Sequence, residues 1–199
     1  VFSLHKLTPP AMRSILSSQV HLDAVLGPGH VSAIIGWQAW EFIPREFGVS
    51  CAAAGFEPVD ILLAIRSLVN AVLRGQPCNL NSYQRGVRAE GNLIAQRIMA
   101  QVFDVSTAEW RGLGCLPESG LVIRDRFSRF DARQRFQVPH MPSSSVASGC
   151  RCGAVLAAIA EPADCPLFGN LCTPVRPLGP CMVSSEGACA AYFRYGSEL

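Results

Sequence analysis

The sequence predicts an α/β protein, in which a parallel sheet built from βα units is followed by a small irregular segment rich in cysteine. Short apolar stretches alternate with longer stretches that carry apolar residues at helical spacing, and Gly/Pro turns separate them. Six of the nine cysteines lie between residues 150 and 189, which indicates a separate metal-binding or cross-linked segment.

The first elements are a helix and a βα unit. Two prolines predict that the stretch 8–16, TPPAMRSIL, opens as a helix. An apolar strand is expected at 22–26, followed by the turn GPGH at 27–30. Apolar spacing then predicts a helix over 31–43.

The second βα unit repeats this plan. A strand is expected at 48–54, the turn GFEP at 55–58 and a helix over 59–75 with a continuous apolar stripe. Pro58 suits the first helical turn and Gly75 suits the C-terminal cap.

The loops that follow parallel strands share one edge of the sheet, where ligands bind. This rule places His30 and Glu57 on the same rim, each at the start of a helix. Glu57 is expected to cap its helix, and Asp60 to stabilise the same helix end through the helix dipole.

Residues 81–131 are expected to be mainly helical, with an amphipathic helix at 91–103. A glycine-rich break follows at 110–121, and a charged amphipathic helix is expected at 124–136. The proline- and serine-rich stretch 137–149 is the predicted linker. The predicted domains are therefore an α/β domain with a helical extension at 1–136 and a cysteine segment at 150–199.

The charge balance restricts the partners of the protein. With 17 basic and 15 acidic side chains the formal charge is +2, so we expect neither nucleic acid nor an anionic membrane as a partner. No apolar run approaches the length of about 20 residues that spans a bilayer. No signal peptide is evident, and because the chain starts at Val1 we expect an upstream piece to be missing.

The cysteine spacing C-x-C-x12-C-x6-C-x8-C-x7-C leaves three chemical options. Disulfides would need an oxidising compartment, which nothing else in the sequence indicates. A structural zinc site usually presents two close C-x2-4-C pairs, and this spacing has no C-x2-C. A cubane iron–sulfur cluster takes four thiolates and leaves two spare thiols, which can form a redox-active disulfide. The cluster is the favoured option.

Several motifs resemble the HypD family of hydrogenase maturation proteins. They occur in the family's order over nearly the whole chain: PGHVSAIIG at 28–36, GFEPVDIL at 55–62, GNLIA at 91–95, WRGLG at 110–114 and CTPVRPLGPCMVSSEGACAAYFRYG at 172–196.

The resemblance implies a cytoplasmic assembly scaffold with redox activity, not a conventional turnover enzyme. Such scaffolds build the Fe(CN)2CO group of [NiFe]-hydrogenases together with a HypC-type chaperone and a HypE-type cyanide donor. The family carries one [4Fe–4S] cluster on the pattern C-x14-C-x6-C-x16-C. Here that pattern matches Cys150, Cys165, Cys172 and Cys189.

The remaining pair, Cys152 and Cys181, then matches the family's redox-active thiols. This arrangement is similar to that of ferredoxin:thioredoxin reductase, where a cluster passes electrons to a neighbouring disulfide.

The resemblance also makes three polar residues, His30, Glu57 and Glu186, candidates for the site of the iron under assembly. The cysteine motif that holds this iron in the family is absent from the sequence. The chain therefore looks like the C-terminal half or more of a family member, and we expect the transient Fe(CN)2CO centre to need the missing part.

Two other functions remain open at this point. The first is an iron–sulfur-dependent disulfide reductase of the ferredoxin:thioredoxin reductase type, which would turn over a protein disulfide. The second is a binding module whose cysteines hold zinc, which would contain no sulfide.

Overall fold

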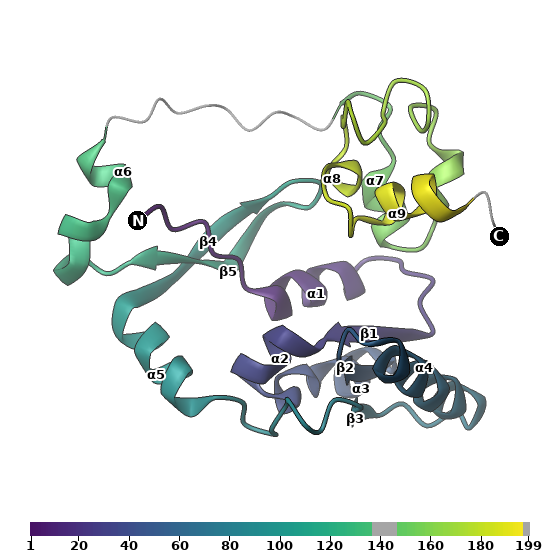
Figure 1. Ribbon diagram of the computed structural model, residues 1–199, viewed down its shortest axis with the longest axis horizontal. Coiled ribbons are helices and arrows are strands. Elements are labelled where there is room, and N and C mark those ends of the chain that lie inside the picture. Colours follow the sequence, from purple (N-terminus) through teal and green to yellow (C-terminus); the bar gives the residue numbers. More distant parts are fainter. Residues whose placement is uncertain (137–146, 197–199) are drawn as a thin grey trace. The chain divides into compact units, whose positions relative to one another are not determined.

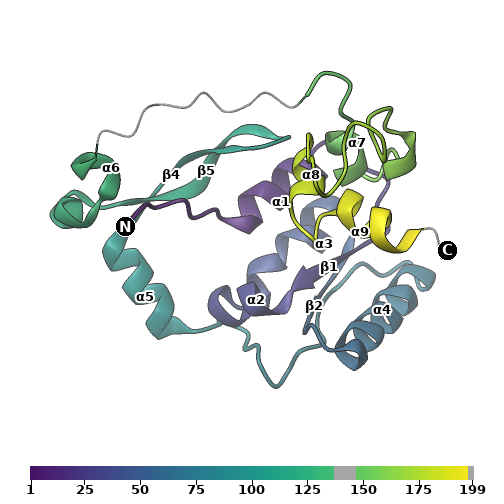
Figure 2. The ribbon, with the colours of Figure 1, turned by 45° about the horizontal axis from the view of Figure 1, so that its top comes forward.

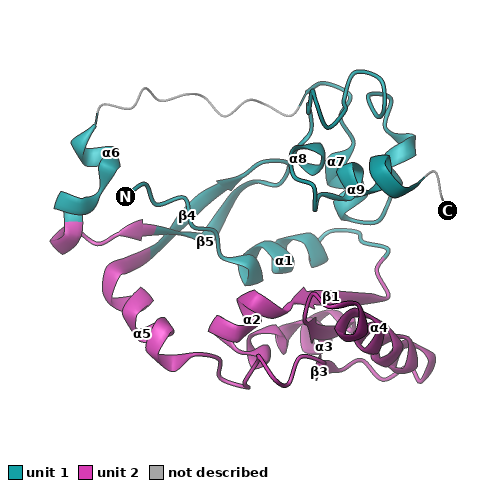
Figure 3. Ribbon diagram, viewed as in Figure 1, with its two compact units in different colours: residues 1–21, 105–121, 128–199 teal, residues 22–104, 122–127 magenta. Residues whose placement is uncertain are grey.

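The computed structural model describes residues 1–136 and 147–196 (Figure 1). These residues form two compact units (Figure 3). One unit comprises 22–104 and 122–127, and the other comprises 1–21, 105–121 and the residues from 128 onward. Residues 137–146 of the predicted linker lie outside the described residues, so the predicted domain boundaries stay a prediction.

A parallel three-stranded sheet organises the unit that contains residues 22–104. The strands β1 (Ala24–Pro28), β2 (Ser50–Ala54) and β3 (Asn79–Asn81) lie in the order β1-β2-β3. Both pairings are parallel, which confirms the predicted α/β class. Strand β3 was not predicted, because it is only three residues long and Leu80 is its one apolar residue.

The helix α4 (Pro58–Leu73) confirms the prediction for the second βα unit. Its Ala64 and Leu68 pack against Ala52 and Ala54 of β2. Figure 2 shows the helix beside the strands of the sheet. The small alanine side chains let the helix lie close to the strand. Gly75 follows the helix with a positive φ of 63°, the left-handed conformation of a C-terminal cap.

The single helix predicted over 31–43 is wrong. The chain instead forms α2 (Gly29–Ile35), the 3-10 helix η1 (Trp37–Trp40) and α3 (Phe42–Phe47). Gly36 causes the break, because it has a φ of 86° and a Cβ there would collide with the carbonyl oxygen of Ala89.

The mainly helical prediction for residues 81–131 is also wrong. The helix α5 (Leu93–Val102) is present, but it leads directly into β4 (Phe103–Trp110), which pairs with β5 (Gly114–Ile123). Gly112 and Gly114 both have positive φ and form the turn that joins the two strands.

The charged helix predicted at 124–136 is two short pieces, the 3-10 helix η2 (Asp125–Phe130) and α6 (Ala132–Arg135). Asp131 divides them, because its carboxylate accepts a hydrogen bond from the N–H of Arg133 and caps the second piece.

The other unit holds the cysteine segment, together with the predicted N-terminal helix α1 (Thr8–Leu16). The helices of the cysteine segment are short: α7 (Cys152–Leu156), the 3-10 helix η3 (Pro162–Asp164), α8 (Pro180–Val183) and α9 (Ala188–Tyr195). The segment is irregular, as predicted, and cysteines form much of its core. Across the described ranges, no helix combines the length and apolar character needed to cross a membrane.

Candidate functional site

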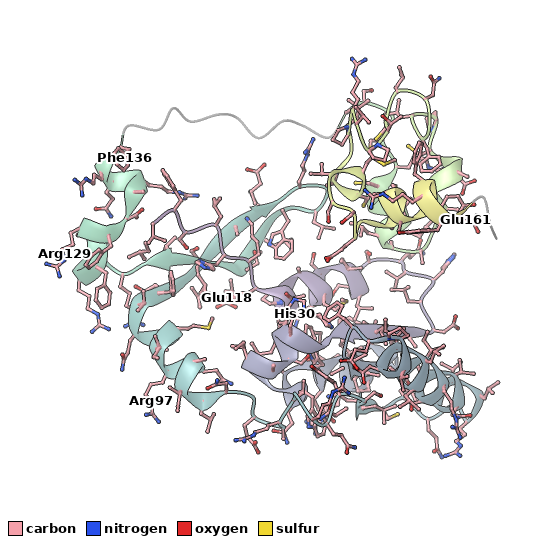
Figure 4. The ribbon with its side chains drawn as sticks, in the orientation of Figure 1. His30, Arg97, Glu118, Arg129, Phe136 and Glu161 are labelled. Atoms are coloured by element: carbon pink, nitrogen blue, oxygen red, sulfur yellow. The ribbon has the colours of Figure 1, made fainter. Side chains whose placement is uncertain are left out.

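Six cysteines from five short elements and loops meet in the C-terminal segment. Cys150 precedes α7, which begins at Cys152, and Cys165 ends η3. The others lie in a tight loop and in α8 and α9: Cys172, Cys181 and Cys189. Sulfur atoms accordingly gather among α7, α8 and α9 (Figure 4). Five of the six are buried, Cys150 is half-buried, and all six are free thiols.

Two glycines permit the close packing of this segment. A Cβ at Gly179 would lie 2.6 Å from the sulfur of Cys150, and a Cβ at Gly187 would collide with the carbonyl oxygen of Cys181. The backbone at these two glycines therefore lies so close to Cys150 and Cys181 that a side chain at either position would collide with them.

The predicted redox pair is in contact. The thiol of Cys181 donates a hydrogen bond to the sulfur of Cys152, and this bond lowers the pKa of Cys152 to about 6. A second thiol, that of Cys150, contributes in the same direction. The pKa of Cys181 is raised, first because it donates this bond and second because it is buried.

The turn between β4 and β5 also contributes to this site, which sequence reasoning missed. A Cβ at Gly112 would lie 3.2 Å from the sulfur of Cys152. The neighbouring Arg111 donates to the carbonyl oxygen of Leu178 at 3.1 Å, and its positive charge helps to lower the pKa of Cys152. The motif WRGLG holds both residues, but it lies far from the cysteines in the sequence.

Two of the predicted cluster ligands, Cys172 and Cys189, share a buried cluster with this pair, and Cys150 packs against that cluster. The N–H of Leu178 points at the sulfur of Cys172 from 3.3 Å. Burial, followed by repulsion from the neighbouring sulfur atoms, raises the pKa of Cys189 to about 11. Burial also raises the pKa of Cys150. Several thiolates together are unfavourable here unless a positive charge compensates them.

This donor set fits an iron–sulfur cluster by its chemistry. Buried thiols that repel one another when ionised, together with a backbone N–H directed at sulfur, are features of cluster sites. In the described ranges 1–136 and 147–196, no group of three or more His, Cys, Asp or Glu side chains is arranged to hold a metal ion. A cubane is bulkier than one ion and is reached by four cysteines from different directions.

The rim of the parallel sheet is the second candidate site, in the other unit. His30, at the start of α2, stacks on Phe56 with ring centroids 4.9 Å apart (Figure 4). Phe56 precedes Glu57, the residue before α4. His30 and Glu57 thus follow neighbouring strands at one edge of the sheet, as predicted.

Glu57 occupies the N-cap position, but its side chain does not cap the helix. Its carboxylate forms an ion pair with Arg85 at 3.0 Å. Asp60, in the first turn as predicted, accepts the Glu57 N–H instead and also binds Arg85. The hydrogen bond from Arg85 is the main reason why the pKa of Asp60 is lowered. Arg85, which also lies over the ring of Tyr83, was not predicted.

Glu186 lies in the exposed loop between α8 and α9, and its N–H donates to the hydroxyl of Ser184 at 3.2 Å. Its position in the sequence, between Cys181 and Cys189, keeps it in the cysteine segment. The other cysteines stay apart from that segment in the sequence. Burial raises the pKa of Cys51 to about 12, whereas Cys115 is exposed.

Comparisons with known proteins agree with the motifs. The family model described as "HypD: Hydrogenase formation hypA family" matches residues 1–196. The hydrogenase maturation factor HypD of Cupriavidus necator is 45% identical over 98% of this chain and 54% of its own length. That of Azotobacter vinelandii is 44% identical, over 100% of this chain and 54% of its own length.

An archaeal relative is more distant. A putative hydrogenase expression/formation protein of Methanocaldococcus jannaschii is 37% identical over 98% of this chain and 54% of its own length. The chain thus spans about half the length of these curated relatives.

Proposed function

This chain belongs to the HypD family, and we propose that it acts in [NiFe]-hydrogenase maturation as part of a scaffold on which the Fe(CN)2CO group is assembled. The iron under assembly is the cargo of this scaffold. A HypC-type chaperone and a HypE-type cyanide donor are the proposed partners. The family membership and the chemistry of the cysteine segment support this function.

Four thiolates, those of Cys150, Cys165, Cys172 and Cys189, are proposed to hold a [4Fe–4S] cluster. When bound, this cluster supplies single electrons at a low-dielectric site. The ligands themselves exclude water, because three of them are buried and Cys150 is half-buried. The N–H of Leu178 lies 3.3 Å from the sulfur of Cys172. It therefore stabilises negative charge on that ligand.

The Cys152–Cys181 contact is the single observation that carries the redox part of the proposal. Oxidation of the two thiols forms one S–S bond and releases two electrons and two protons, and reduction reverses this. The neighbouring Cys181 thiol lowers the pKa of Cys152 and so favours its thiolate, which is the nucleophilic form. Both sulfurs are buried, which restricts exchange with outside thiols.

Three polar residues are proposed to serve the iron cargo. His30 offers an imidazole at the sheet rim, and Glu57 is oriented by its ion pair with Arg85. Glu186 offers a carboxylate from the cysteine segment. Since the chain spans about half of its relatives, assembly of the complete Fe(CN)2CO group is proposed to need the remainder of the family's length.

The experiment that tests the redox pair is a thiol count by mass spectrometry after anaerobic oxidation and alkylation. The wild-type chain should lose two alkylation sites, with a disulfide between Cys152 and Cys181. Cys152→Ser should lose none, while Cys115→Ser, which removes an exposed thiol, should still form the disulfide. Free thiols at both positions in the oxidised wild-type chain would refute the pair.

The same contact fits a second function, a cluster-dependent disulfide reductase acting on a partner protein. That function requires turnover of a protein disulfide when an external electron donor is supplied. The scaffold function does not require turnover of a protein disulfide. An assay with a disulfide-bonded protein substrate therefore separates the two functions.

A further inference from the structure

The helix α4 carries more apolar surface than the sheet beneath it covers. Its buried residues form one narrow stripe: Asp60, Ala64, Leu68 and Ala71. Large apolar side chains on both sides of this stripe are exposed, among them Leu62 (65%), Val69 (50%) and Leu73 (79%). A helix that is apolar nearly all round is normally packed on more than one side.

A groove runs beside this helix, within the same compact unit. It has a volume of about 340 Å³ and lies between the start of β1 and α4, with the buried Leu68 among its lining residues. Asp23 and Ala24 line it from the strand side, and Ile65, Val69, Val72 and Leu73 line it from the helix. Its lining is almost wholly apolar, with Asp23 as the acidic exception.

The strand that borders this groove is an edge strand. Within the described residues, β1 pairs with β2 alone, so its other edge has no strand beside it. Parallel strands are usually covered on both faces by helices, and an unpaired strand edge is a place where another chain segment can pack. Within the described residues of this compact unit, no strand lies beside the free edge of β1.

The relatives contain a long stretch of sequence that this chain does not match. Each of the three compared relatives is matched over 54% of its length, so the family contains almost as much chain again outside the matched region. We propose that the exposed face of α4 and its groove are the docking surface for that remaining part of the HypD fold, which lays an apolar helix along α4. This inference is independent of the proposed redox chemistry.

The test co-expresses this chain with the part of the Cupriavidus necator relative that it does not match, and measures their association by sedimentation velocity. The test variant is Val69→Lys with Leu73→Lys. The control is Val175→Lys, which makes the same substitution at a side chain that is 95% exposed in the other unit. Circular dichroism shows whether each variant keeps its helix content, since all three side chains are exposed.

The wild-type chain and Val175→Lys should each form a one-to-one complex. The lysine pair on α4 should weaken association by about tenfold or more, because it removes two apolar anchors from the interface. No complex with the wild-type chain, or a complex that the α4 lysines leave unchanged, would overturn the proposal. The proposal would also be overturned if this chain alone formed a dimer that the α4 lysines dissociated. The surface would then bind a second copy of this chain.

Iron and sulfide content is measured on the same samples. Loss of the complex with unchanged metal content separates a failure of this surface from a failure of the proposed cluster site.

Discussion

Arg85 holds the carboxylate of Asp60 with two parallel hydrogen bonds, of 2.5 Å and 2.7 Å, at the rim of the parallel sheet. The same carboxylate accepts the N–H of Glu57, and the second carboxylate on Arg85 is that of Glu57 itself. The start of α4 is thereby fixed to the segment that follows β3. Such bidentate pairs add geometric specificity as well as stability.

The first prediction concerns the pH dependence of this contact. The folded-state pKa of Asp60 lies below its unfolded value, which is about 3.9 for a free aspartate. Its contribution to stability is therefore complete above the unfolded pKa and is lost as the pH falls through the folded-state pKa. Asp60→Asn should lower the melting temperature at pH 7 and should lower it progressively less below about pH 4. Thermal unfolding across pH tests this, and a melting-temperature difference that is constant with pH would contradict it.

The second prediction concerns the break after α2. Gly36→Ala combines a left-handed backbone with a collision against the Ala89 carbonyl. It should therefore destabilise the fold by about 2–5 kcal/mol. Gly48→Ala is the matched control, because Gly48 also has a positive φ of 66°.

A Cβ at Gly48 would meet nothing within 4 Å, so this control tests the backbone conformation without a collision. Its expected cost is that of the left-handed backbone alone, about 1–2 kcal/mol. Urea unfolding of both variants measures the difference, and equal costs would show that the collision at Gly36 is relieved.

The third prediction concerns the packing of glycine against Cys150. Gly179→Ala would place a methyl group 2.6 Å from that sulfur, so it should lower the iron content of the purified protein. Gly169→Ala, in the same segment and with no atom within 4 Å of its Cβ, should retain its iron. Iron retention that is equal in both variants would mean that Cys150 is not a ligand or that it moves freely.

The fourth prediction separates ligands from redox thiols. Cys165→Ala should abolish the cluster, because four thiolates are needed to hold a cubane. Cys152→Ala should keep the cluster and lose the reversible disulfide. Iron analysis and thiol counting on the two variants test the assignment. Cluster loss in Cys152→Ala alone would mean that a ligand and a redox cysteine have been exchanged.

The strongest periodic pattern in the sequence predicted α4 correctly, because its apolar stripe and Pro58 are local features. The rim formed by His30 and Glu57 followed from the topology of parallel strands. The third strand could not be predicted, because β3 is short, has Leu80 as its one apolar residue, and pairs with β2, which lies far away in the sequence. The hairpin of β4 and β5 was missed because its turn, with Gly112 and Gly114, was interpreted as a glycine-rich break between helices.

In the candidate sites, too, local sequence features could be predicted and contacts between distant residues could not. The family resemblance, and not the spacing alone, divided the six cysteines into four expected ligands and two expected redox thiols, and Cys152 and Cys181 lie in one buried cluster. Arg111 and Gly112 reach Cys152 only through the folded turn, and Arg85 reaches Asp60 from 25 residues away. Contacts of this kind have no periodicity in the sequence, so only the three-dimensional structure places them.

The most direct test of this account is the content of iron, zinc and acid-labile sulfide in the anaerobically purified chain, measured with its visible absorption spectrum. The account predicts about four irons and four sulfides per chain, the content of a cubane held by four cysteines. Stoichiometric zinc without sulfide, in a colourless protein, would contradict it and would make the cysteine segment a structural zinc site.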